Sequence, residues 1–62
     1  MDNGDKYHRK GKMYTVIQTP DWSMSTVDQS VQIEDTCGTK SMVPLMYFLM
    51  NYSKYINTQI IT

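Results

Sequence analysis

The longest periodic segment of the chain is Met42–Ile56, with the sequence MVPLMYFLMNYSKYI. Projected as a helix at about 100° per residue, it gathers most of its apolar side chains on an arc of roughly 220°, whereas about 100° suffices for an ordinary surface helix. Ser41 is suited to cap this helix, and Pro44 fits its first turn because no hydrogen-bond donor is lost there. The segment therefore predicts a long amphipathic helix with surplus apolar surface, fraying near Asn57.

Two other segments have the composition of strands. MYTVIQT, residues 13–19, is rich in β-branched and aromatic side chains, and VQIEDT, residues 31–36, alternates apolar and polar side chains. Cys37-Gly38 predicts a turn after the second strand, because glycine tolerates a positive φ. Residues 20–30 are compatible with a single turn, a short helix or a capped loop, and TQIIT at Thr58–Thr62 predicts a short last strand.

These elements predict an α+β fold. We expect a small sheet of two or three short strands, one long C-terminal amphipathic helix packed on it, and a disordered N-terminal arm. The arm is residues 1–12, which hold six charged side chains and two glycines. Residues 13–62 are expected to form a single small domain.

A chain of 62 residues has little surface to bury, and it contains one cysteine, Cys37, so it cannot form an internal disulfide. His8 and Cys37 are too few soft ligands for a structural zinc site. Oligomerisation or complex formation remains as a source of extra burial, and we expect a homodimer. The net charge is zero, which gives no broad footprint for nucleic acid. The free cysteine and the lack of an early apolar segment predict a cytoplasmic protein that does not enter a membrane.

The sequence offers no arrangement of catalytic groups. His8 lies in the expected arm, where nothing would orient it, and Cys37 has no histidine beside it to act as a base. Glu34 and Asp35 would point to opposite faces of a strand, and the three glycines form no phosphate loop. We therefore expect no enzyme activity, no cofactor and no metal.

Candidate binding residues fall into two groups. Methionines repeat at i, i+4 and i+8 in the expected helix, and we expect this row to face a partner while Leu45, Leu49, Tyr52 and Ile56 pack on the sheet. Exposed aromatic residues add interface anchors. The expected partner-binding residues are Met42, Met46, Met50, Trp22 and Tyr47, and the expected electrostatic arm is Lys6, Arg9, Lys10 and Lys12.

These features favour a small non-catalytic protein–protein interaction module. The size and composition are typical of an inhibitor or modulator of a host protein, encoded by a phage or mobile element and acting by steric occlusion in the host cytoplasm. The identity of the protein partner does not follow from the sequence. Two alternatives stay open: a small nucleic-acid-binding protein that uses the basic arm, and an orphan protein of no specific function.

Overall fold

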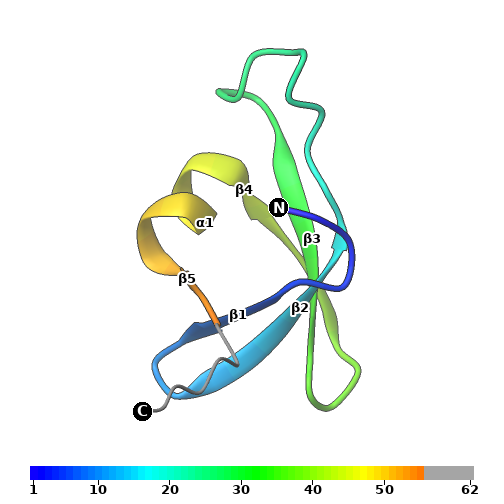
Figure 1. Cartoon of the computed structure of the whole chain (residues 1–62). Helices are drawn as coiled ribbons and strands as arrows, with labels where there is room; N and C mark the ends of the chain where they lie inside the picture. The colour runs from blue at the N-terminus through cyan, green and yellow to red at the C-terminus, as the bar shows by residue number, and fades with distance from the viewer. Residues whose placement is uncertain (56–62) are drawn as a thin grey trace, which may run out of the picture.

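The computed structural model describes residues 1–55, which form one antiparallel sheet and one short helix (Figure 1). The elements are β1 (Lys6–Arg9), β2 (Lys12–Gln18), β3 (Ser30–Asp35), β4 (Lys40–Pro44), α1 (Leu45–Asn51) and β5 (Ser53–Lys54). The strand order across the sheet is β4-β3-β2-β1-β5. The first four strands thus form a meander, and β5 returns after α1 to pair with β1.

The predicted long helix over Met42–Ile56 is wrong, and so is the fold class built on it. Residues 40–44 form β4, α1 has only seven residues, and Tyr52 is already extended with φ −113° and ψ 142°. Val43 lies opposite Val31 in the sheet and is buried, so pairing with β3 outweighs the local helical period. Pro44, with φ −54° and ψ 136°, ends the strand and precedes the helix, which leaves Ser41 inside β4 and not at a cap.

The predicted disordered arm is also wrong, because Lys6–Arg9 forms β1. Arg9 pairs with Lys12, so Lys10 and Gly11 are the two central residues of a tight hairpin turn. Their φ angles are 52° and 80°, the positive values that a type I′ turn requires at both positions. On its other side β1 pairs with β5, which gives this strand an interior place in the sheet.

The predictions for the two middle strands are confirmed, since β2 and β3 lie within a residue of the expected bounds. The turn at Cys37-Gly38 is confirmed as well. Gly38 has φ 89°, and the Asp35 carboxylate accepts hydrogen bonds from the amides of Cys37 and Thr39 at 2.8 and 3.0 Å. Residues 20–29 contain turns and bends and no helix. The strand predicted at Thr58–Thr62 lies outside the described residues.

The core lies between α1 and one face of the sheet. It consists of six buried side chains, Val16, Val31, Ile33, Val43, Leu45 and Phe48, with Met1, Tyr7, Tyr14 and Tyr52 packed around them. Each fully buried apolar side chain of this kind contributes about 1.5–3 kcal/mol. The short helix thus stays in place through its burial against the sheet, since seven residues alone would not be stable in water. In the described part of the chain, no helix has the length and apolar character needed to span a membrane.

Candidate functional site

The surface of this small fold carries many large apolar side chains. Residues 1–55 expose nine of them, against six in the buried core. Seven of the nine belong to α1 and to the loop between β2 and β3 (residues 19–29), and one of the seven, Tyr47, contacts Arg9 and is described separately below. We call the other six residues the α1–loop surface: Met46, Leu49 and Met50 of α1, and Trp22, Met24 and Val27 of the loop.

The helical part of this surface follows from how α1 is turned. Leu45 and Phe48 point into the core and are fully buried. Met46 and Met50, four residues apart, share another side of the helix, and their side chains are 47% and 80% exposed. A seven-residue helix with two buried anchors therefore presents two methionines and Leu49 to solvent.

The loop part is held in shape by polar contacts around one glutamine. The Gln29 side chain accepts a hydrogen bond from the Asp21 amide and donates to the Asp21 carbonyl, both at 2.7 Å, and it also donates to the Ser25 carbonyl at 2.9 Å. The Asp21 carboxylate accepts bonds from the Ser23 hydroxyl and amide at 2.6 and 3.0 Å, and these bonds lower the pKa of Asp21. The loop therefore has internal ties at both ends.

Two contacts join the loop to the helix. The Leu45 amide at the start of α1 donates to the Gln29 carbonyl at 2.8 Å. The Thr26 hydroxyl lies 3.8 Å from the sulfur of Met46, a weak donor–acceptor contact. These contacts put the end of the loop beside the first turn of the helix, so the two parts of the α1–loop surface adjoin.

Two residues predicted to act separately, Arg9 and Tyr47, contact each other. The Arg9 guanidinium donates to the Tyr47 hydroxyl at 2.9 Å and lies 5.6 Å from the ring centroids of both Tyr47 and Tyr52. Tyr52 in turn stacks on Phe48 at 4.7 Å, and burial raises its pKa. Arg9 therefore ties β1 to Tyr47 of α1, a contact that spans 38 positions of sequence.

The remaining predicted site residues lie apart. Met42, 62% exposed, is on β4 opposite Gln32, so it does not continue the helical row of Met46 and Met50. Lys10 and Lys12 are exposed at the tip of the β1–β2 hairpin. Lys6 donates from its ammonium group to the Thr15 hydroxyl at 2.7 Å.

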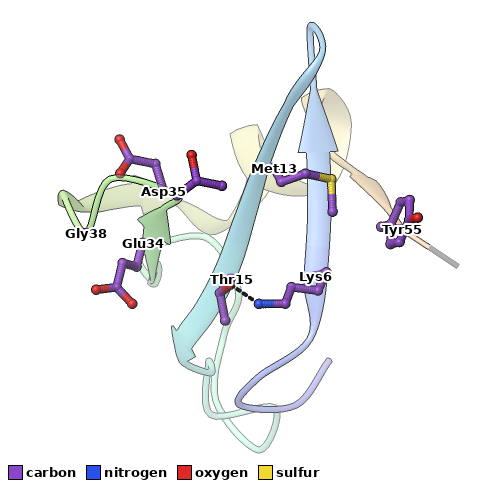
Figure 2. Close-up of a pocket in the computed structure, with 8 residues that line it drawn as sticks. Lys6, Met13, Thr15, Glu34, Asp35, Gly38 and Tyr55 are labelled. Atoms are coloured by element: carbon purple, nitrogen blue, oxygen red, sulfur yellow. Dashed lines mark hydrogen bonds between the residues drawn. The ribbon is translucent and has the colours of Figure 1, made fainter. Parts of the chain in front are cut away.

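A shallow hollow of about 680 Å³ lies on the sheet face opposite α1, and sequence reasoning missed it (Figure 2). Lys6, Thr15 and Glu34 meet there because they stand opposite one another on β1, β2 and β3. Predicting this hollow would have required the register of β1, β2 and β3, and the residues of β1 were expected to be disordered. The lining is completed by Met13, Asp35, Thr36, Gly38 and Tyr55. This lining contains neither a histidine nor a cysteine, and residues 1–55 hold no cluster of three potential metal ligands.

No protein-family model, curated protein or solved structure matches this chain. The argument for a function therefore rests on the residues themselves. Among the features above, the α1–loop surface is the most extensive one that folding leaves unexplained.

Proposed function

We propose that this protein is a small non-catalytic protein–protein interaction module that covers part of a partner's surface with its α1–loop surface. The observation that carries the proposal is the excess of exposed over buried large apolar side chains among residues 1–55. Contiguous exposed apolar patches are typical of interaction sites. Removing apolar area from water on docking contributes about 25 cal/mol per Å², and steric occlusion of the partner would follow without any chemical step.

The way the surface is held supports this proposal. Leu45 and Phe48 fix the orientation of α1, and Gln29 fixes the loop, so little conformational entropy is lost on binding. Methionine side chains adapt to an irregular partner surface, and Trp22 supplies a rigid aromatic group of the kind found at binding hot spots. A partner with a complementary apolar groove is the occupant that this combination suits.

The narrower function is an inhibitor or modulator of a host protein, encoded by a phage or mobile element and acting in the host cytoplasm. It is supported by the length of 62 residues and by Cys37, an exposed free thiol of the kind that reducing compartments preserve. This part of the proposal depends on composition, whereas the interaction module depends on the exposed apolar side chains.

A nucleic-acid-binding function is the alternative, and the exposed Lys10 and Lys12 at the hairpin tip favour it. Two contacts weigh against it. The rings of Tyr7 and Tyr14 pack on Phe48 and Tyr52, so they are not free platforms for bases. Binding to single-stranded DNA that weakens steeply as salt rises would favour this alternative over the module.

The test compares two variants of α1 in which an aspartate is introduced at neighbouring positions. Met50→Asp puts a charge into the α1–loop surface, and Asn51→Asp puts the same charge on the adjacent, already polar position at the same helix end. Both variants carry a similar unfavourable interaction with the helix dipole. Asn51→Asp also loses the hydrogen bond that the Asn51 amide donates to the Tyr47 carbonyl at 3.0 Å, so binding lost only in Met50→Asp cannot result from a weaker helix. Circular dichroism checks that both fold.

Immobilised wild type and both variants are then used to capture proteins from a host-cell extract, with quantitative mass spectrometry as the readout. We expect one protein that binds the wild type and Asn51→Asp equally and binds Met50→Asp at least about tenfold less. If no captured protein separates Met50→Asp from Asn51→Asp, the α1–loop surface is not the docking site and the proposal fails.

A further inference from the structure

The edge strand β4 offers a second surface, separate from the α1–loop surface. In the described sheet, β4 is paired only with β3, so its other side has no neighbouring strand among residues 1–55. An edge of this kind presents unpaired N–H and C=O groups that can pair with another chain. Which residues present them follows from the hydrogen-bonding phase of the β3–β4 ladder.

Two backbone hydrogen bonds at the ends of the ladder fix this phase. The Asp35 amide donates to the Thr39 carbonyl at 3.0 Å, and the Leu45 amide donates to the Gln29 carbonyl at 2.8 Å. Hydrogen-bonded and non-hydrogen-bonded pairs alternate in an antiparallel ladder. Odd-numbered residues of β4 therefore bond to β3, and the backbone groups of Lys40, Met42 and Pro44 point outward.

Pro44 contributes nothing to the outer edge. It has no N–H, and as the N-cap residue of α1 its carbonyl accepts the first helical hydrogen bond. The usable outward groups are the N–H and C=O of Lys40 and of Met42, which lie one on each side of Ser41. A long foreign strand would meet Pro44 after these two positions, so the edge suits a short and self-limiting pairing.

We propose that β4 pairs antiparallel with β4 of a second copy of this chain, with the two-fold axis at Ser41. In this register Lys40 lies opposite Met42 of the second copy, and Ser41 lies opposite Ser41. Each Lys40–Met42 pair exchanges two backbone hydrogen bonds, so all eight outward groups of the two strands are satisfied. A second copy is the occupant because the usable positions are symmetric about one residue, as an isologous contact requires.

The side chains are compatible with this register. Lys40 faces a methionine and not the other lysine, which would be the outcome of a register centred on residue 40. Glu34 lies directly opposite Lys40 on β3 and compensates its charge within each copy. Met42, 62% exposed in the single chain, gains a neighbour across the interface.

A disulfide trap tests the register. Non-hydrogen-bonded antiparallel pairs bring Cα atoms to about 4.5 Å, within the 4.4–6.8 Å that a disulfide spans. Ser41→Cys in a Cys37→Ser background is expected to oxidise to a covalent dimer on a non-reducing gel. Thr39→Cys in the same background is the control, because two copies of residue 39 would lie roughly 14 Å apart in this register.

A rapid cross-link of Ser41→Cys with little cross-link of Thr39→Cys supports the proposal. Equal cross-linking of both variants, or of neither, overturns it. The α1–loop surface contains neither position, so this result is independent of the capture experiment with Met50→Asp.

The wild-type mass gives a second test, by light scattering coupled to size exclusion over a range of protein concentrations. Met42→Pro removes an outward N–H without removing a bond to β3, and Met42→Thr keeps that N–H. We expect the dimer dissociation constant to rise roughly tenfold or more for Met42→Pro and to change little for Met42→Thr. If the wild-type mass stays at 7.2 kDa up to a protein concentration of about 1 mM, the dissociation constant of any dimer lies above that concentration, and this result contradicts the proposal.

Discussion

The helix α1 and the 19–29 loop both expose large apolar side chains, but they are anchored by different kinds of interaction. Two fully buried side chains, Leu45 and Phe48, hold the helix against the sheet. Three hydrogen bonds of the Gln29 side chain, one accepted and two donated, hold the loop. The apolar side chains of α1 thus cannot be released without damaging the core, whereas those of the loop can be released while the sheet stays folded.

The largest expected effect is on the helix anchor. Phe48→Ala removes a fully buried ring that contacts Tyr7 and Tyr52, and it should cost about 3–5 kcal/mol. A domain of this size has a total free energy of unfolding of roughly 3–9 kcal/mol, so much of it is lost. Urea unfolding followed by circular dichroism measures the change. Met50→Ala, on the exposed side of the same helix, should stay within about 0.5 kcal/mol; similar losses for both would show that α1 is not anchored through Phe48.

A smaller effect is expected at the contact between β1 and α1. Arg9→Ala removes the hydrogen bond to Tyr47 and the stacking over two rings, and it should cost about 1–2 kcal/mol. Thermal unfolding of Arg9→Ala beside Lys12→Ala, an exposed neighbour on the same hairpin, measures the difference. An equal shift in melting temperature for the two variants would mean that Arg9 contributes only its charge.

The loop anchor should show the opposite behaviour. Gln29→Ala removes three hydrogen bonds within the loop, and because the core is untouched we expect a change in global stability of about 1 kcal/mol or less. Amide hydrogen exchange in residues 21–25 should accelerate by roughly tenfold, while exchange in β2 and β3 stays unchanged. Gln18→Ala, an exposed glutamine outside the loop, is the control. A loss of stability as large as that of Phe48→Ala would remove the distinction between the two regions.

The smallest effect concerns acid. Bonds from the Ser23 hydroxyl and then its amide lower the pKa of Asp21 below its usual value of 3.8, so the charged form is favoured in the folded loop. Their stabilisation is complete above the unfolded pKa and is lost as the pH falls through the lowered folded pKa. Hydrogen exchange of the Ser23 amide should therefore show an extra loosening below about pH 4, after correction for its intrinsic pH dependence. Ser23→Ala should reduce this extra loosening; if it persists unchanged, Asp21 is not its source.

The two middle strands could be predicted because their signals are local. Alternation in residues 31–36 and the β-branched run in residues 13–19 each match one strand. The error at Met42–Ile56 has a local signal too: a residue before proline is disfavoured in the helical region, so a helix that contains Val43 and continues through Pro44 is unfavourable. The pairing of Val43 with Val31, by contrast, is a long-range contact that no local period reveals.

The N-terminal strand was missed because its composition resembles a solvated tail. Its charged side chains face solvent or bond to another side chain of the sheet or helix. The turn at Lys10-Gly11 has a positive φ at Lys10, but Lys-Gly is a weaker sequence signal for such a turn than Asn-Gly. Met46 and Met50 are exposed, but so is Leu49, which was expected to pack on the sheet. The contact of Arg9 with Tyr47 could not be predicted. It joins positions that only the finished sheet brings together.

Trp22 is the only tryptophan in the chain, and it lies in the loop with 53% of its surface exposed. Tyr7, Tyr14 and Tyr52, in contrast, pack against the core. The protein therefore carries two natural optical reporters that respond to different events. Indole fluorescence follows the loop, whereas the near-ultraviolet dichroism of the phenol rings follows the core. An unlabelled sample can thus distinguish a loop that opens from a chain that unfolds.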